Sequence, residues 1–457
     1  MSGLTTAWVA RWMRDHGYDV VEGPDVPVTG GAADSRRVTA GDLFAAYPGE
    51  RTDGNLYVGD AFERGAVAAV CSRMPAGEWP GRTIAVVPDV REAMGLLARD
   101  WRRACGSRVV GITGTVGKTT TKEIAGRLIG TRFRTHRSPG NLNSREGMPL
   151  AVMSLSPGHE VSVLELAMDR KGEIVELCAI AEPEVGIVLN IGLTHAEKLG
   201  SIEAIAEEKL SLARWLGPGA TAILNADDPR VAAGAAGLRA RVLTFGASDS
   251  AMLRRGPIAD RGHAGTRFDV TWDGQVRTVE SPLPGAHLVS GLLAAMAAGL
   301  ALGMTVDEVV DAAAHTAGSG RMRALRGHNG ATVLDDSYNS SPASLAGALE
   351  HLAGLPGRHL ALLGKMAELG EASEQEHRRL GAIAAGTTDI LFTFGPDCEA
   401  LAAGARDAGH HDVRWFATRD EAAAAARDTL REGDTILVKG SRSEELERVL
   451  PTLGVEA

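Results

Sequence analysis

The chain has 457 residues, of which 44% are hydrophobic, and its 58 acidic side chains outnumber its 48 basic ones, giving a net charge of −10 at pH 7. This length predicts about three domains, each able to bury a large core. The acidic balance excludes a general attraction for nucleic acid or for an anionic membrane surface. The sequence shows neither a signal peptide nor a membrane span, so we expect a cytoplasmic protein that works on small molecules, as a monomer.

Cysteine usage agrees with a reducing compartment. The four cysteines lie far apart in the chain and form no CxxC pair; they are Cys71, Cys105, Cys178 and Cys398. We therefore expect buried, reduced thiols, and neither a disulfide framework nor a zinc site.

Residues 1–105 are expected to form a first domain of short strands and helices. Its most distinctive segment, residues 34–46, places turn residues and two arginines before an apolar strand. Ser35 and Arg36 could therefore face an anionic ligand. The alternative is a solvent-exposed loop, which this segment favours when it is considered alone.

Residues 106–318 are expected to form a second domain, which opens with a strand, a glycine-spaced loop and a helix. The loop consists of Gly114, Thr115, Val116, Gly117, Lys118, Thr119 and Thr120. In this context backbone N–H groups and the helix N-terminus cradle phosphates, Lys118 reaches the terminal phosphates, and the Thr119 hydroxyl serves Mg²⁺. The strict Walker spacing is not met, because its first glycine would fall on Ile112. The alternative is a glycine-rich turn without a ligand; we expect ATP.

Polar residues follow further strands of the second domain. Glu165 and Asn225 stand at the ends of the apolar runs 161–166 and 221–225, and His195 comes shortly after the run 185–191. In an open parallel sheet, ligands bind at the carboxyl ends of the strands, so Glu165 and His195 are candidates for a metal. Asn225 could contact a nucleobase or merely shape a turn. Lys209, on an expected helix, is by its sequence context a solvated charge.

Residues 319–457 are expected to form a third domain. Strands are predicted at 331–334, 359–363, 390–394, 413–416 and 435–438, with helices between them. This alternation predicts a doubly wound, mostly parallel sheet, and hence an α/β protein. The first strand runs into the polar residues Asp336 and Asn339, which we expect at the ligand edge.

Taken together, these residues resemble the Mur ligase family over nearly the whole chain. The shared motifs are Asp34-Ser35-Arg36, the loop from Gly114 to Thr120, Gly140-Asn141-Leu142-Asn143, Asn225-Ala226-Asp227-Asp228-Pro229, Asp336-Ser337-Tyr338-Asn339, Met366-Ala367-Glu368-Leu369-Gly370 and Lys439-Gly440-Ser441-Arg442-Ser443. Each is weak alone, but their order and spacing are specific. The last three favour the member that adds D-alanyl-D-alanine to a UDP-linked muramoyl tripeptide in peptidoglycan synthesis.

The resemblance implies a uridine-nucleotide-binding first domain, a central P-loop ATPase and a Rossmann-like third domain. It also implies a role for each matching residue: the loop from Gly114 to Thr120 for the ATP phosphates, Asn225 for adenine, Arg321 for the phosphate tail, Asp336 for ribose, Thr119, Glu165, His195 and Lys209 for Mg²⁺, and Ser35, Arg36, Asn141, Asn143 and Asn339 for the other substrates. Lys118, Lys209, His195 and Glu165 are expected to carry catalysis.

For Lys209 the resemblance replaces the local interpretation. It implies a lysine carbamylated by CO₂, fourteen positions after His195. A free ammonium would repel Mg²⁺, whereas a carbamate offers it an anionic oxygen.

The chain departs from the family pattern at three places. It has Ser144-Arg145-Glu146 within the usual Asn-Asn-Glu-Ile-Gly, Ala167-Met168-Asp169 for Gly-Ala-Asn, and Lys365 for Asp. These positions lie where the acceptor and its peptide should bind, so they bear on substrate choice rather than on ATP chemistry.

The resemblance therefore implies an ATP-dependent, ADP-forming amide ligase. The γ-phosphoryl group would pass to a substrate carboxylate, and an amine would displace phosphate from the acyl phosphate. Two alternatives stay open: a Mur-type ligase for another acid and amine, such as a specialised-metabolite peptide or a poly-amino acid, and a small-molecule P-loop kinase that stops after phosphorylation.

Overall fold

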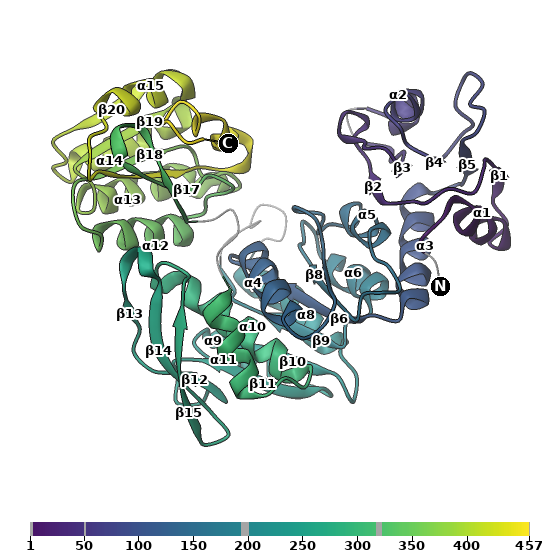
Figure 1. Ribbon diagram of the computed structural model, residues 1–457, viewed down its shortest axis with the longest axis horizontal. Coiled ribbons are helices and arrows are strands. Elements are labelled where there is room, and N and C mark those ends of the chain that lie inside the picture. Colours follow the sequence, from purple (N-terminus) through teal and green to yellow (C-terminus); the bar gives the residue numbers. More distant parts are fainter. Residues whose placement is uncertain (1–2, 50–51, 193–200, 317–321, 457) are drawn as a thin grey trace.

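The computed structural model describes residues 3–49, 52–192, 201–316 and 322–456. Within these ranges the strands form three sheets, which use residues 19–86, 108–281 and 323–439 (Figure 1). The predicted α/β class is confirmed. The division into domains 1–105, 106–318 and 319–457 stays a prediction; here the three parts are called the first, second and third units. None of the helices in the described ranges has the length and apolar character needed to cross a membrane.

The first unit is a small sheet in the order β1-β5-β4-β3-β2, parallel except for the edge strand β1. Its elements are α1 (Thr6–Asp15), β1 (Asp19–Val21), β2 (Gly30–Ala32), β3 (Asp42–Ala45), α2 (Val58–Glu63), β4 (Ala68–Cys71), β5 (Thr83–Val86) and α3 (Val90–Cys105). The Asp89 side chain caps the start of α3, and Gly106 ends the helix with a φ of 70°, a left-handed conformation that suits glycine.

The second unit is built on a larger sheet in the order β13-β14-β12-β11-β10-β9-β6-β8-β7, with β15 paired to β14. Its elements are β6 (Arg108–Thr113), α4 (Lys118–Gly130), β7 (Thr135–Arg137), α5 (Gly147–Met153), β8 (Val161–Glu165), α6 (Glu173–Ala181), β9 (Val185–Val188), α8 (Ile202–Trp215), β10 (Thr221–Asn225), α9 (Pro229–Ala233), β11 (Arg241–Gly246), β12 (Leu253–Arg255), β13 (Ala259–Asp260), β14 (Thr266–Trp272), β15 (Gln275–Ser281), α10 (Val289–Ala301) and α11 (Val306–His315). The strands from β7 to β12 pair in parallel, whereas β13, β14 and β15 add an antiparallel extension that the sequence analysis did not predict.

The third unit has the predicted doubly wound sheet, in the order β16-β17-β21-β18-β19-β20. Its elements are β16 (Arg323–Arg326), β17 (Thr332–Asp336), α12 (Pro342–Ala353), β18 (His359–Leu363), α13 (Ser373–Ala385), β19 (Ile390–Phe394), α14 (Glu399–Asp407), β20 (Val413–Phe416), α15 (Arg419–Thr429) and β21 (Thr435–Lys439). The sheet is parallel except for the edge strand β16, which the sequence analysis missed.

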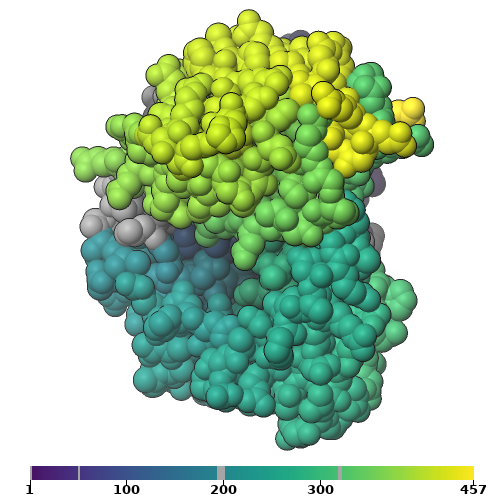
Figure 2. Space-filling view, turned by 90° about the vertical axis from the view of Figure 1, so that its left-hand side faces the viewer, coloured from purple at the N-terminus to yellow at the C-terminus, as the bar shows by residue number. Residues whose placement is uncertain are grey.

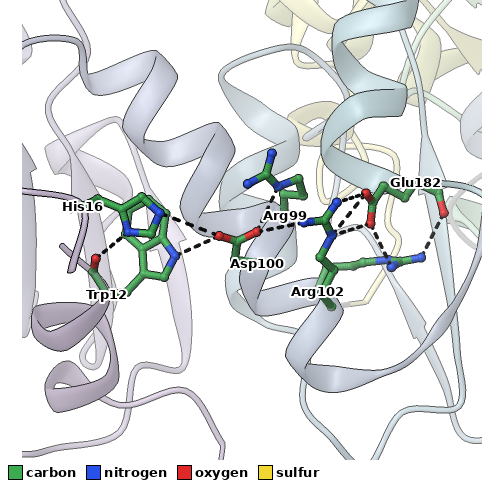
Figure 3. A network of polar contacts seen from close by, with 7 residues as sticks. Trp12, His16, Arg99, Asp100, Arg102 and Glu182 are labelled. Carbon is green, nitrogen blue, oxygen red and sulfur yellow. Dashed lines mark hydrogen bonds and ion pairs between the residues drawn. The ribbon is translucent and has the colours of Figure 1, made fainter.

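Helix α3 fixes the first unit to the second. On one side the Asp100 carboxylate accepts a hydrogen bond from Trp12 Nε1 of α1 at 3.1 Å. On the other side the Glu182 carboxylate, just after α6, accepts hydrogen bonds from Arg102 at 3.2 Å and from Arg103 at 2.9 Å (Figure 3). Buried apolar residues of α1, α3, α5 and α6 belong to one continuous core cluster. The first unit is therefore packed on the second and not merely tethered to it.

Two local features of the fold are a helix cap and the state of the cysteines. Ser201 caps α8, where its side chain accepts a hydrogen bond from Ala204 N at 3.2 Å. The four cysteines are buried and free, as predicted.

A second core cluster joins α4 and α10 of the second unit to Leu345 and Leu349 on α12 of the third.

A buried histidine gives the second unit a predictable response to acid. The His136 ring on β7 contacts Ser162 Oγ at 2.9 Å and Ser154 Oγ at 3.0 Å. Burial, followed by the neighbouring His159, lowers the pKa of His136 to about 4. An unfolded histidine has a pKa near 6.5, so between these two values the unfolded chain binds a proton that the folded chain does not. The free energy of unfolding must therefore fall as the pH falls through this window.

The difference in pKa lowers the free energy of unfolding by roughly 2 kcal/mol between pH 7 and 4.5, and we expect His136→Gln to remove this decrease. Urea denaturation over a pH series measures it. The exposed His315 provides the matched control, since His315→Gln should keep the wild-type slope. Parallel slopes for His136→Gln and wild type would contradict the expectation.

Candidate active site

Three parallel strands of the second unit deliver their carboxyl ends to one edge of the sheet. β6 lies between β8 and β9, with Ile112 beside Glu165 and Thr113 beside Val188. The glycine loop follows β6, and the Asn190 segment follows β9. Residues distant in the chain therefore meet where an open α/β sheet binds ligands.

The loop after β6 is stabilised by hydrogen bonds from its own Lys118 and from Asn190, which follows β9. Lys118 Nζ donates hydrogen bonds to the carbonyls of Gly114 at 2.8 Å and Thr115 at 3.1 Å. The Asn190 side chain accepts from Val116 N at 2.9 Å and donates to Val116 O at 3.0 Å. Gly117 has a φ of 84°, and α4 begins directly after it. This strand–loop–helix arrangement is that of an anion-binding helix N-terminus.

A buried carboxylate stands beside the first turn of α4. Glu165 is 2% exposed. Its Oε2 accepts a hydrogen bond from Thr119 Oγ1 at 2.9 Å, and its Oε1 accepts one from Asn143 Nδ2 at 2.8 Å. Three of the predicted site residues are thus in direct contact.

Lys209 is not the solvated lysine that its sequence context suggested. It is 2% exposed. Its Nζ donates to the carbonyl of Gly114 at 3.1 Å, the same oxygen that Lys118 contacts. Burial, followed by the charge of Lys118, holds the pKa of Lys209 well below its usual range. The structure therefore joins Lys209 to the phosphate loop.

A central cavity of about 410 Å³ opens in front of this group. It lies between the second and third units, and a hollow between the teal and the yellow-green parts of the surface is visible in Figure 2. Its lining includes Lys118, Thr119, Asn141, Asn143 and Glu165 from the second unit, and Tyr338, Asn339, Glu368 and Arg442 from the third. Substrate candidates and phosphate-loop residues therefore share one space.

A second cavity of about 210 Å³ lies behind the loop and shares Val116 and Gly117 with the central cavity. Asp336 and Lys439 of the third unit line it. The two side chains form a buried ion pair, and Lys439 Nζ also donates to Asn339 O at 2.9 Å. Asp336 is thus placed next to the loop, as the ribose assignment requires.

Arg36 borders a cleft between the first and third units, whereas the neighbouring Ser35 does not line it. Ser35 is buried, whereas the Arg36 guanidinium is exposed and is held by two hydrogen bonds to Asp34, at 2.9 and 2.8 Å. An interdomain cleft of about 890 Å³ is lined by Arg36 and Arg37 and by Tyr338 and Arg442. The sequence prediction that Arg36 borders a ligand-sized space is therefore compatible with the geometry.

One predicted residue, Asn225, is not brought into this group. Both ends of the Asn225 amide are engaged, since Nδ2 donates to Leu189 O at 2.8 Å and Oδ1 accepts from Asp227 N at 2.9 Å. These contacts favour the turn-shaping alternative, and the adenine role stays a prediction. His195 and Arg321 fall outside the described residues.

Comparison with known proteins decides the family. Three regions match its descriptions: residues 27–102 the "Mur ligase family, catalytic domain", residues 112–299 the "Mur ligase middle domain", and residues 320–442 the "Mur ligase, glutamate ligase domain". The UDP-N-acetylmuramoyl-tripeptide–D-alanyl-D-alanine ligase of Bacillus subtilis is 32% identical over 93% of each chain. The ligase of that name from Escherichia coli is 31% identical over 95% of each chain.

The chain belongs to the Mur ligase family.

Solved structures agree with this assignment. MurF from Acinetobacter baumannii superposes with a TM-score of 0.85 at 27% identity, covering 97% of this chain and 98% of that one. MurF from Thermotoga maritima, solved in complex with ADP, gives a TM-score of 0.78 at 29% identity, covering 93% and 97%. The three-domain Mur ligase fold implied by the resemblance is confirmed.

This Mur ligase also has site residues that the sequence analysis missed. Asn190, Lys439 and Tyr338 are examples: each belongs to a segment quoted for its pattern, but none received a role. Glu173 is another; its buried carboxylate accepts a hydrogen bond from Asp169 N at 2.7 Å and lines the central cavity. For Asn190 and Lys439 the polar character at a strand end was the available signal, but their partners Val116 and Asp336 lie in distant parts of the chain.

We expect Lys118→Ala to lower turnover of ATP at least about 100-fold, because it removes a cation that faces the transferring phosphoryl group. Stability should change by only about 1 kcal/mol, since Lys118 contributes hydrogen bonds to two loop carbonyls. Phosphate release and thermal melting measure the two effects. Lys171→Ala, at an exposed lysine, is the control. Phosphate release by Lys118→Ala near the wild-type rate would refute the assignment.

Proposed function

We propose that this Mur ligase joins the terminal carboxyl group of a UDP-linked muramoyl tripeptide to the amino group of D-alanyl-D-alanine, with conversion of ATP to ADP and phosphate. This is a step of peptidoglycan synthesis. The names of the relatives that align with almost the whole chain support it.

One geometric observation carries the proposal. The central cavity and the interdomain cleft share three wall residues, Asn141, Tyr338 and Arg442. A long acceptor with an anionic end near Arg36 and Arg37 could therefore extend through the cleft and present a carboxylate near Lys118. A small acid would not need such a path.

The chemistry requires an activated carboxyl group, because the oxyanion of a carboxylate is a poor leaving group. Transfer of the γ-phosphoryl group to a carboxylate oxygen forms an acyl phosphate and releases ADP. The amine nitrogen then bonds to the carbonyl carbon and loses a proton, while the bond from that carbon to the phosphate oxygen breaks. Lys118 and the N–H groups at the start of α4 would neutralise charge during the first transfer.

The second cavity is the space that we assign to the nucleoside. It begins at Gly117, Thr120 and Thr121 on the far side of the phosphate loop and reaches Asp336. A nucleotide whose phosphates lie on the loop would thus have its ribose near Asp336.

The residues near Thr119 fit Mg²⁺ in their chemistry. The Glu165 carboxylate and the Thr119 hydroxyl are hard oxygen donors in contact at 2.9 Å. No group of three or more His, Cys, Asp or Glu side chains able to hold a metal is found within the described ranges. The proposed set therefore also draws on His195, outside those ranges, and on Lys209. When bound, Mg²⁺ would supply positive charge to the phosphoryl oxygens.

The proposal for the substrates is tested by phosphate release with an acceptor panel: UDP-MurNAc-tripeptide, free peptides and glutamate chains, each with and without D-Ala-D-Ala. We expect release only when UDP-MurNAc-tripeptide and D-Ala-D-Ala are both present, and mass spectrometry should find the joined pentapeptide. Release with another acid–amine pair alone would favour the Mur-type ligase for other substrates. A phosphorylated acid formed without any need for an amine would favour the kinase.

We further propose that Lys209 is carbamylated in the active enzyme. Burial lowers the pKa of its amine and so favours the neutral form, which adds to CO₂ with loss of a proton. Lys209→Ala should then lose nearly all turnover, and acetate in the buffer should partly restore it by supplying the missing carboxylate oxygens.

The exposed Glu207, two positions earlier on α8, provides the control, since Glu207→Ala should keep wild-type turnover. Thermal melting verifies that both variants are folded. A fully active Lys209→Ala, or a folded but inactive Lys209→Ala for which no carboxylic acid restores turnover, would refute the carbamate.

A further inference from the structure

Lys122 is a buried cation to which the proposed reaction gives no task. It lies on α4, and its side chain is 0% exposed. Its Nζ donates hydrogen bonds to the carbonyls of Ser138 at 2.7 Å and Gly140 at 2.6 Å, and Glu123 Oε1 lies at 3.4 Å. An ammonium has three donors, and here each has an oxygen nearby. This pairing offsets part of the cost of burying a charge, while burial still lowers the pKa of Lys122.

The two carbonyls belong to the loop of residues 138–146, which borders the central cavity. This loop carries Asn141 and Asn143, both of which line the cavity. Asn143 Nδ2 donates to Glu165, and its carbonyl accepts a hydrogen bond from Ala167 N at 2.9 Å. The position of the loop therefore sets the orientation of the buried carboxylate.

Helix α4 contacts both the phosphate loop and the loop 138–146. Lys118 and Thr119, in its first turn, face the phosphate loop and Glu165, whereas Lys122, one turn later, reaches the loop 138–146. Lys122 therefore links α4 directly to the loop 138–146. Among the side-chain hydrogen bonds of the described residues, those to the Ser138 and Gly140 carbonyls come from Lys122.

We propose that Lys122 is a positioning residue, which ties the loop 138–146 to the phosphate-binding helix so that Asn141 and Asn143 keep their places relative to Lys118 and Thr119. Lys122 lines neither the central cavity nor the second cavity. Its effect on the acceptor rests on the proposed function; its effect on the loop does not. A merely space-filling role would be met equally well by methionine.

Hydrogen exchange of the loop amides tests the positioning itself. Leu142 N donates to Pro139 O at 3.2 Å and Gly147 N to Ser144 Oγ at 3.2 Å, so these amides should be protected in the wild type. In Lys122→Met we expect them to exchange at least about 10-fold faster. Arg137→Met is the matched control, because Arg137 pairs with Glu123 of the same helix at 2.9 Å without contacting the loop carbonyls. Equal exchange in Lys122→Met and wild type would overturn the proposal.

Steady-state kinetics of the full-length enzyme test the consequence. For Lys122→Met we expect the KM for the acceptor to rise at least about 10-fold and kcat to fall, with the KM for ATP within about threefold of wild type. Arg137→Met should keep both KM values. Faster exchange with unchanged kinetics would reduce Lys122 to a structural residue and overturn the positioning role.

Lys122→Gln, which also buries no charge, replaces the methionine variant under the same criteria if Lys122→Met does not fold. If the wild type itself joins no acid to an amine, the proposed function fails, while the exchange measurement still decides the role of Lys122.

Discussion

The parallel pairing of β6 with β8 and β9 is the constraint on which the rest of the site depends. Because all three strands run the same way, their connections leave the sheet at one edge. Glu165 ends β8 beside Ile112 of β6, and the phosphate loop begins two residues further on. An antiparallel neighbour would have sent its polar end to the opposite edge. The third unit lines the central cavity at this edge, and the first unit packs against α5 and α6 of the second.

At that edge one backbone carbonyl, that of Gly114, contacts two lysine side chains. The Gly114 oxygen accepts from both Lys118 and Lys209, which brings two basic groups close together. Two neighbouring ammonium groups repel, and the more buried one loses its proton first. Lys209 is the buried one, and its pKa is lowered accordingly. The loop thus holds two lysines in different environments, since Lys118 lines the central cavity whereas Lys209 is buried and has a lowered pKa.

The sequence predicted what depends on neighbouring residues, and missed what depends on distant ones. Apolar runs located several strands of the parallel sheets and the loop before α4. The antiparallel strands β13 to β15 were not predicted, because strands with one exposed face alternate buried and exposed residues and show no continuous apolar run. The burial of Lys209 could not be seen either, since its flanking residues Glu207 and Glu208 resemble a solvated face. Asn190 and Lys122 act through partners many positions away, which no local pattern reveals.

The departures from the family pattern separate into two kinds once they are placed in the fold. Lys365 pairs with Asp397 at 2.9 Å and Glu444 at 3.6 Å, and the first of these contacts raises the pKa of Lys365. Lys365 lines neither the central cavity, the second cavity nor the interdomain cleft. Its positive charge, in place of the usual aspartate, is therefore paired with carboxylates of the third unit. Ser144 and Asp169, in contrast, both line the central cavity. At Ser144 a short hydroxyl replaces the amide that is usual in the family, and Asp169 adds a negative charge. Both changes alter the cavity wall beside Glu165 that a substrate would contact. We therefore expect a difference in acceptor or amine from other Mur ligases to arise at these two loops, because among the three departures they are the ones that line the central cavity.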